Sequence, residues 1–416
     1  MRWRSVSLED IATDMQPGFA CQPSLDGIPQ LRTNNISPDG RLDLSEIKRV
    51  PATKVQLAKY QLTPGDILFN NTNSPDLVGK TAFFDLSGEF TFSNHMTRIR
   101  VSSTVADPRY VARFLHWAWV QGAFRALVTQ WVNQAAINRS QLASVTIPLP
   151  PLSEQRRIVE ILDQADHLRR LRAEADAKAD RILPALFIKM FGDPATNPMG
   201  WPVVPLARLA MIGGSLVNPS EEEYLDLPHV GGENIEKETG RLLNLRSVRE
   251  SRPRSPKFLF SERHILYCKI RPYLNKVAFP REKGLCSADI YPVLPIDRRI
   301  GPWYLLALLR SDGFLRYARG QADRLRMPKL NREQLGAFPV PIPPPDRVAA
   351  FELAGVQISW LDARRNRASQ CISRLFGCLL HRAFSAELTA SWRETHMKEL
   401  LQEMEQQAKA LARSGS

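Results

Sequence analysis

Two long stretches of the chain repeat apolar residues with the seven-residue period of a coiled-coil helix. The second stretch follows the first at a distance of 193 residues. The predicted seam residues are Ile158, Ile161, Ala165, Leu168, Arg172 and Ile182 in the first stretch, and Phe351, Ile358, Leu361, Arg365, Ile372 and Leu375 in the second. Pro184 and Gly377 interrupt the two patterns at matching positions, so we expect both helices to kink or end there.

The segments that precede these helices repeat as well. Residues 137–142 reappear as 330–335, and the proline-rich segment 147–151 reappears as 340–344. Short β-branched and aromatic runs at 67–70, 81–84 and 96–101 predict strands, and the aromatic spacing over 108–128 predicts a helix. The repeat therefore predicts two similar globular domains of mixed α/β (α+β) structure.

The order of these segments predicts five parts. A first globular domain spans 1–150 and its helix 151–191, a second domain spans 192–345 and its helix 346–388, and an amphipathic helical tail spans 389–416. Two equal seams in one chain can bury each other, so we predict an antiparallel two-helix coiled coil with the two domains at its opposite ends. From Ser153 to Pro184 the rod would be about 48 Å long. The tail either covers this rod or docks a partner.

The charge balance points to a polyanionic partner. The 416 residues include 56 lysines and arginines against 43 acidic residues, a net charge of +13. Between Arg241 and Lys283 twelve basic residues face only three acidic ones, which predicts contact with a phosphate backbone. Five scattered cysteines and the absence of a leader or an 18-residue apolar run predict a protein of the reducing cytoplasm.

Motifs for catalysis are missing from this basic chain. The sequences after Asn197 and Asn218 lack the second proline and the aromatic residue that an amino-methyltransferase uses to hold a flipped base. Gly79-Lys80-Thr81 lacks the first glycine of a Walker loop, since Ser74 stands in its place. A nuclease-like pattern between Asp39 and Lys48 is better explained by the structural repeat, and the seven histidines form no H-x-x-x-H pair. We predict that the chain is not an enzyme and binds no metal.

Three segments carry a resemblance to a known family. They are Pro150–Ile158 (PPLSEQRRI), Met190–Pro202 (MFGDPATNPMGWP) and Ala383–Leu388 (AFSAEL). Together with the repeat, which covers nearly the whole chain, they resemble the DNA-specificity (S) subunit of type I restriction-modification systems, which act in phage defence. The second linker departs from the pattern, because Asp346-Arg347-Val348 stands where the Ser153-Glu154-Gln155 of the first linker would be expected.

The resemblance implies a function. In that family each globular domain is a target-recognition domain that reads one half of a bipartite double-stranded DNA site, and the two conserved helices set the spacing between the halves. Partner subunits supply the chemistry: two modification subunits methylate adenine with S-adenosylmethionine, and restriction subunits use ATP and Mg²⁺. The chain itself would then bind no cofactor.

Two loops are candidates for reading the DNA. Residues 69–80 are similar to a recurrent loop of these domains, although Asn71 stands where many members have arginine, and residues 269–276 resemble its other common version. Arginine pairs well with guanine and asparagine with adenine, so these loops suit base contacts. The predicted DNA-binding residues are Asn70, Asn71, Thr72, Asn73, Ser74, Lys80, Arg252, Arg254, Lys257, Lys269, Arg271, Tyr273, Asn275, Lys276, Arg324, Arg326 and Lys329.

A second interpretation of the sequence stays open. A stand-alone coiled-coil DNA-binding regulator or architectural protein would show the same charge and the same repeat. Partner dependence separates the two interpretations, because a specificity subunit should bind its target far better together with a modification subunit.

Overall fold

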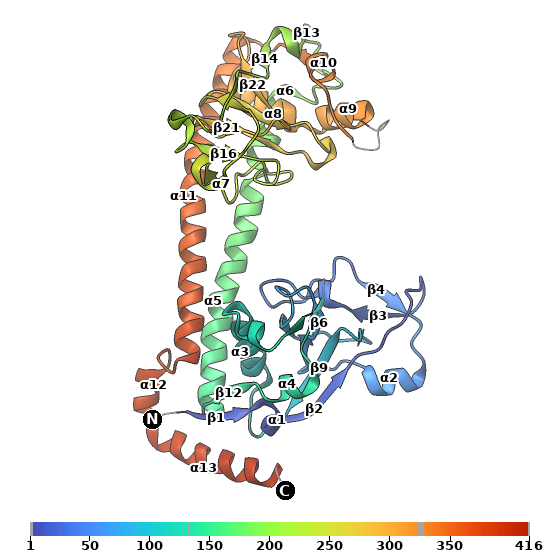
Figure 1. Ribbon diagram of the computed structural model, residues 1–416, viewed down its shortest axis with the longest axis vertical. Helices are drawn as coiled ribbons and strands as arrows, with labels where there is room; N and C mark the ends of the chain where they lie inside the picture. The colour runs from blue at the N-terminus through green and yellow to red at the C-terminus, as the bar shows by residue number, and fades with distance from the viewer. Residues whose placement is uncertain (1–2, 131–133, 323–327, 415–416) are drawn as a thin grey trace. The chain divides into compact units, whose positions relative to one another are not determined.

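The computed structural model describes residues 3–130, 134–322 and 328–414. The chain divides into two compact units, Met1–Arg170 with Gln370–Ser416, and Leu171–Ser369. Two long helices, α5 (Leu152–Ala179) and α11 (Pro345–Phe384), contribute to both units (Figure 1). Each unit therefore contains one globular domain and one segment of each long helix.

The domain of the first unit is built on the antiparallel sheet β2-β9-β5-β7, with a second sheet of order β4-β3-β8 and a third of order β10-β11-β6. The strand β1 pairs with β12. The strands are β1 (Arg4–Ser7), β2 (Ala12–Pro17), β3 (Ile28–Leu31), β4 (Lys48–Val50), β5 (Ile67–Asn70), β6 (Thr72–Asn73), β7 (Thr81–Phe83), β8 (Thr91–Phe92), β9 (Met96–Val101), β10 (Thr129–Gln130), β11 (Ala135–Ala136) and β12 (Thr146–Leu149). The strands predicted at 67–70, 81–84 and 96–101 are confirmed.

The helices of this unit cover the sheet and the chain ends. They are α1 (Leu8–Ile11), η1 (Thr33–Asn35), α2 (Lys54–Tyr60), α3 (Pro108–Val120), η2 (Ala123–Ala126), α4 (Arg139–Ala143), α12 (Ala390–Thr395) and α13 (Met397–Ser414). Asp107 caps α3 by accepting hydrogen bonds from the amides of Arg109 and Tyr110. The predicted helix over 108–128 is shorter than expected, because Gly122 adopts a left-handed conformation and a 3₁₀ turn follows. Buried faces of α3 and of the sheet form the core.

The domain of the second unit repeats this plan. Its sheet β14-β22-β19-β20 corresponds to β2-β9-β5-β7, and β13 pairs with β23 as β1 pairs with β12. The strands are β13 (Val203–Pro205), β14 (Ala210–Ile212), β15 (Leu216–Val217), β16 (Pro228–Val230), β17 (Arg246–Ser247), β18 (Lys257–Phe260), β19 (Ile265–Cys268), β20 (Val277–Ala278), β21 (Gly284–Cys286), β22 (Ile290–Pro295) and β23 (Pro339–Pro341). The helices are α6 (Ile182–Phe191), η3 (Leu206–Arg208), η4 (Glu222–Tyr224), α7 (Val248–Ser251), η5 (Pro272–Leu274), α8 (Pro302–Arg310), α9 (Asp312–Ala322) and α10 (Arg332–Gly336).

The repeated Asn-x-x-Gln motif is a helix cap. Asn138 caps α4 and Asn331 caps α10, and in each case the asparagine side chain accepts from the amide of the glutamine three residues later, while the glutamine side chain accepts from the asparagine amide. This capping box satisfies donors that a helix start otherwise leaves unpaired. The repeat seen in the sequence is therefore a repeat of local structure, and the predicted mixed α/β fold with two similar domains is confirmed.

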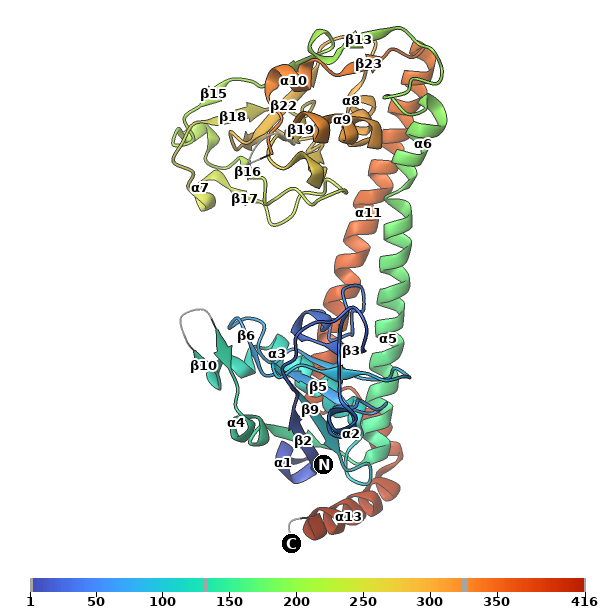
Figure 2. The ribbon, with the colours of Figure 1, turned by 90° about the vertical axis from the view of Figure 1, so that its right-hand side faces the viewer.

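The long helices pair antiparallel within each unit. In the first unit the start of α5 packs against the end of α11, where Ile158 and Leu162 share a core with Leu380. In the second unit Arg172 donates to the Arg365 carbonyl at 3.1 Å, and Asp176 accepts from Ser369 at 2.6 Å. The two arginines that break the apolar pattern at matching positions thus meet each other. Figure 2 shows the paired segments beside their domains.

Half of the predicted seam is wrong. The row with Ile158, Ala165 and Arg172, and its counterpart with Phe351, Ile358 and Arg365, does face the other helix or the core, while Ile372 is half-buried. The second row does not, since Leu168, Ile182, Leu361 and Leu375 are 63%, 52%, 53% and 58% exposed. The helices meet instead along residues one position later, which include Leu162, Asp176, Leu183, Asp362, Ser369 and Phe376. Ile161 is half-buried at the edge of the interface.

The expected break is present in only one helix. The first helix ends at Ala179, and Pro184 lies in the first turn of α6, where its missing amide costs no helical hydrogen bond. The second helix runs without a break from Pro345 to Phe384, through Gly377, so that expectation is wrong. A single glycine in a helix costs only about 1 kcal/mol, which packing of Phe376 and Leu380 in the core offsets.

The C-terminal tail packs on the first unit. Leu400 of α13 is fully buried, and the Gln407 side chain donates to the carbonyls of Val105 and Pro150 at 2.6 and 3.2 Å. The Arg393 side chain forms a buried ion pair with Glu154 at the start of α5. The predicted helical tail is confirmed, and its apolar face covers the domain rather than the middle of the long helices. In the part of the chain that the structure describes, no helix has the length and apolar character needed to cross a membrane.

Candidate DNA interface

The candidate reading loop of the first unit joins β5 to β7. Its backbone is fixed on both sides, because the amides of Asn71 and Thr72 donate to the His95 carbonyl and β6 pairs with β11. Thr72, Asn73 and Ser74 are half-buried, so part of each side chain reaches solvent. The Asn71 amide nitrogen donates to Thr97 Oγ1 at 3.1 Å, which orients this side chain on the sheet. The loop therefore presents a short row of amide and hydroxyl groups on a backbone that these hydrogen bonds fix in place.

Two residues nominated in this loop are structural. Asn70 is fully buried and donates to the Leu77 carbonyl at 2.9 Å. Lys80 is only 5% exposed, and its ammonium donates to the carbonyls of Thr33 and Ile36. Burial lowers the pKa of Lys80. Both side chains hold the loop from inside and are therefore unavailable to DNA, so these two predictions are corrected.

The corresponding loop of the second unit joins β19 to β20 and contains η5. Arg271 is exposed, with a left-handed backbone (φ 52°), and Tyr273 is 44% exposed. The other nominated side chains are tied to the domain: Lys269 donates to the Ala288 carbonyl, Asn275 to the Arg310 carbonyl and Lys276 to the Gly232 carbonyl. Arg271 and Tyr273 are thus the members of this loop that face solvent most freely.

A neighbouring segment completes each loop. In the first unit the amide of Ile137 donates to the Asn71 carbonyl at 3.0 Å, and in the second the amide of Leu330 donates to the Lys269 carbonyl at 3.0 Å. Lys329 next to it is exposed. The two units therefore build the same two-segment surface from corresponding parts of the repeat, with amides and hydroxyls in one and cations in the other.

Two further arginines near the second loop belong to a basic cluster of the sequence that could face either DNA or a partner subunit, and they are not among the nominated DNA contacts. Arg319 of α9 donates to the Tyr273 carbonyl at 3.4 Å, and Arg332, the first residue of α10, is exposed. Burial, and then the charge of nearby Lys329, lower the pKa of Lys269, and Arg332 adds to this effect. These cations are therefore clustered. Their signal in the sequence is the concentration of basic residues shortly before the second proline-rich linker.

The remaining nominated residues lie elsewhere. Arg252 and Arg254 are exposed in the loop that follows α7. Lys257 is only 6% exposed and donates to Ser255, so it is corrected to a structural residue. Arg324 and Arg326 lie outside the described residues.

Replacing Arg271 tests this surface. We expect Arg271→Ala to weaken sequence-specific DNA binding by about 1–3 kcal/mol and to relax the base preference at the DNA positions that this surface would contact. Arg299→Ala is the matched control, because Arg299 forms an ion pair with Asp297 outside this surface. Fluorescence anisotropy with substituted half-sites measures both effects, and equal losses for all DNA sequences would instead make Arg271 a phosphate contact.

Comparisons with known proteins identify relatives of the chain. Residues 27–178 match the family model of the type I restriction modification DNA specificity domain. The chain is 32% identical over 200 residues to the specificity subunit of the type I restriction enzyme EcoDI from Escherichia coli. This match covers 47% of this chain and 44% of that protein. It is 30% identical over 142 residues to the StySPI specificity subunit of Salmonella potsdam, which covers 33% of this chain and 29% of that protein.

Solved structures resemble the fold over most of the chain. The S subunit of a type I restriction-modification system from M. genitalium aligns with a TM-score of 0.54 at 12% identity, over 92% of this chain and 96% of that one. A chain from a study of complex assembly and conformational transition of the type I R-M system aligns with a TM-score of 0.52 at 19% identity, over 93% and 98%. The predicted resemblance to specificity subunits is therefore confirmed, while the sequence matches span less than half of the curated relatives.

Proposed function

We propose that this chain is a DNA-specificity subunit of a type I restriction-modification complex and that it reads a bipartite double-stranded DNA target. The observation that carries this function is the duplicated reading surface: two domains of the same plan each present a loop held by the segment before an Asn-x-x-Gln cap. A chain with two readers suits a target with two half-sites.

The two surfaces favour different half-sites. The first unit offers Thr72, Asn73 and Ser74, whose uncharged groups can contact base edges or sugar-phosphate oxygens. The second offers Arg271, Tyr273 and Lys329, which suit guanine and the phosphate backbone. Because equivalent positions of the repeat carry different chemistry, the target is asymmetric.

We assign the chemistry of the complex to partner subunits. The sequence lacks the methyltransferase and Walker motifs, so S-adenosylmethionine, ATP and Mg²⁺ belong to modification and restriction subunits. The chain acts without catalysis of its own, by binding and orienting DNA.

The exposed apolar row on the long helices suits the docking of modification subunits. Leu168 and Leu375 lie in the first unit, and their sequence equivalents Leu361 and Ile182 lie in the second, all of them more than half exposed. Apolar side chains exposed at matching positions of a repeat indicate two equivalent contact surfaces. Two copies of one partner subunit could therefore bind, one at each of these contact surfaces.

Charges placed in this row should block assembly. We expect Leu168→Glu with Leu361→Glu to weaken binding of the modification subunits about 100-fold or more, because an unpaired carboxylate would be buried in an apolar interface. Gln164→Glu with Gln357→Glu adds the same charge at exposed, equivalent positions beside the row and should leave binding within about twofold. Copurification with a tagged modification subunit measures the difference, and equal effects of both pairs would remove this surface from the interface.

Genome-wide adenine methylation tests the function as a whole. The native host and a strain that lacks this gene are compared at single-base resolution. Loss of methylation at one asymmetric bipartite motif is the expected result and identifies the target with its spacer. If a reconstituted complex with an active modification subunit methylates no bipartite motif, while the chain alone binds DNA specifically, the stand-alone DNA-binding interpretation replaces this one.

A further inference from the structure

A short hairpin with the sequence Gly-Arg-Leu occurs once in each repeat. In the first unit Ile36 bridges Leu42, and in the second Ile235 bridges Leu242. The hairpin glycines Gly40 and Gly240 have positive φ angles of 73° and 67°. The arginine that follows each glycine was counted among the basic residues of the chain, and Arg241 begins the run predicted to contact phosphate. In the structure both arginines instead form ion pairs with an aspartate on or next to helix α5.

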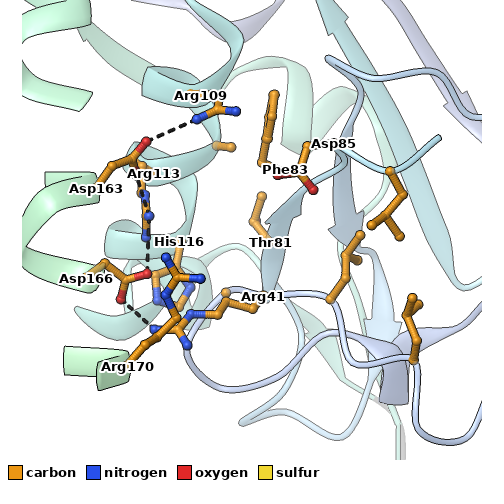
Figure 3. A pocket seen from close by; sticks show the side chains of 15 residues that line it. Arg41, Thr81, Phe83, Asp85, Arg109, Arg113, His116, Asp163, Asp166 and Arg170 are labelled. Atoms are coloured by element: carbon orange, nitrogen blue, oxygen red, sulfur yellow. Dashed lines mark hydrogen bonds and ion pairs between the residues drawn. The ribbon is translucent and has the colours of Figure 1, made fainter. Parts of the chain in front are cut away.

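In the first unit Arg41 reaches from the hairpin to helix α5. Its guanidinium forms an ion pair with Asp166 at 2.7 Å, and Asp166 is only 5% exposed (Figure 3). Arg113 of α3 and Arg169 of α5 lie 3.6 and 3.5 Å from the same carboxylate. Burial opposes the ionisation of Asp166, but the hydrogen bond from Arg41 and the charges of the arginines lower its pKa below the ordinary value. The domain is thereby joined to the long helix through a charged, desolvated contact.

Close packing fixes the same hairpin from a second side. A Cβ atom at residue 40 would lie 2.7 Å from Nδ1 of His116, so the hairpin backbone rests directly against α3. His116 is 7% exposed, and burial followed by the charge of Arg113 lowers its pKa to about 4. Its ring is therefore neutral at pH 7 and adds no charge beside Arg41. The hairpin, α3 and α5 line one cavity of about 500 Å³.

In the second unit Arg241 makes the equivalent contact by a different route. It forms an ion pair with Asp180, just beyond the end of α5, at 2.5 Å, and Asp180 also pairs with Arg365 of α11 at 2.7 Å. Arg310 of α8 donates to the hairpin carbonyl of Glu238 at 2.6 Å. Its position in the helix matches that of His116 in α3, because each residue lies eight positions after the proline that begins its helix. Both hairpins are thus held by one helix of their domain and by an aspartate on or next to α5.

We propose that Arg41 and Arg241 are positioning residues that fix the angle of each reading domain on the long helices, and thereby set which spacer lengths between half-sites are accepted. This role rests on the proposed function. A loop without a charged anchor would allow a domain to pivot, whereas a charge-assisted hydrogen bond from each guanidinium to a largely buried aspartate restricts that motion. Neither arginine contacts DNA in this mechanism.

DNA with a varied spacer tests this role. The complex of the chain with its modification subunits is measured against the target identified by methylation mapping, with the spacer at its native length and one base pair shorter or longer. We expect Arg41→Met and Arg241→Met each to weaken binding of the native target about five- to tenfold. Binding of the targets with a shorter or longer spacer should weaken much less. The ratio of affinities for the native and the altered spacers should therefore fall at least fivefold. Base preference within each half-site should not change.

Two substitutions that also remove one arginine serve as controls. Arg109→Met removes an ion pair with Asp163 in the same cavity, but from α3 and not from the hairpin, and Arg299→Met removes an exposed pair of the second unit. Both should keep the native discrimination between spacers. If the hairpin variants lose affinity equally for every spacer, as a DNA-contacting or merely destabilising residue would cause, the positioning role is wrong.

A measurement without DNA separates this role from the proposed function. Spin labels at Lys54 of α2 and Gln164 of α5, both exposed in the first unit, report the distance between domain and helix when Cys21, Cys371 and Cys378 are replaced by serine. Arg41→Met should broaden the distance distribution, while Arg109→Met should not. An unchanged distribution overturns the positioning role even if the complex reads a bipartite target. If the distance distribution broadens but the complex shows no spacer preference, the role of Arg41 in positioning the domain is retained and the proposed function is overturned.

Discussion

Removing one heptad from both long helices should shift the spacer preference of the complex by about three base pairs. The two deletions are Ala173–Ala179 in α5 and Asn366–Ile372 in α11, each of which shortens its helix by about 10.5 Å. B-DNA rises about 3.4 Å per base pair, which gives the expected change. The native target should then bind at least 1,000-fold more weakly, because one half-site would no longer reach its reader. A library of DNA targets with all spacer lengths, selected for binding, measures the shift.

The paired design preserves the contact between the helices. After both deletions the antiparallel pairing keeps its phase, because seven residues correspond to two turns of a coiled-coil helix. Asp362 then lies where Ser369 faces Arg172 in the native chain. Deletion of the heptad in only one helix makes the paired segments unequal in length, so that the matched contacts at both of their ends cannot form together, and should abolish binding of every target. An unchanged spacer preference in the paired variant would contradict the role of the helices as a ruler.

Replacement of Glu154 should release the C-terminal tail and destabilise the first unit by about 3–5 kcal/mol. The carboxylate is fully buried and accepts from Trp3 Nε1 at 3.1 Å, from Thr389 Oγ1 at 2.6 Å and from Arg393 Nε at 2.8 Å. Glu154→Gln keeps the shape but leaves the Arg393 charge buried without its counter-ion. Hydrogen exchange of the amides of Met397–Ser414 and urea denaturation measure the two effects.

A second substitution identifies the cause. Adding Arg393→Met to Glu154→Gln removes the uncompensated charge and should recover part of the lost stability, as expected for two groups that interact directly. Glu160→Gln, which removes an exposed ion pair with Arg157 on the same helix, should change stability by no more than about 0.5 kcal/mol. Equal protection of the tail amides in Glu154→Gln and in the native chain would mean that other contacts hold the tail.

The same site explains a departure noticed in the sequence. Arg347 occupies the position of Glu154 in the second repeat, and its guanidinium lies 5.9 Å from the ring of Trp201. In the first unit it is Arg393 of the tail that lies 5.2 Å from the ring of Trp3. Each tryptophan therefore receives one arginine. The second linker supplies it directly, while the first linker supplies a carboxylate that holds an arginine of the tail.

The sequence by itself determined the duplication, the elements of each domain and the resemblance to specificity subunits. These features depend on local physics: the Asn-x-x-Gln cap, the β-branched and aromatic runs between 67 and 101 and the seven-residue period of the helices can be recognised without knowing their partners. The surplus of cations likewise predicted a polyanion before any surface was defined.

Only the tertiary structure decided which side of each helix and loop is inside. A heptad period leaves two rows beside the first one equally possible, and here the row with Leu168 and Leu361 faces solvent while Asp176 and Ser369 lie between the helices. Polar residues enter that interface because the arginine of the other helix lies beside each of them: Arg172 donates to Ser369 at 3.3 Å, and Arg365 lies 3.8 Å from the Asp176 carboxylate. Lys80 was predicted to contact DNA because its burial cannot be read from the sequence, and the ion pair of Arg41 is equally hidden there. Their charges are met by carbonyls and a carboxylate that only folding brings near.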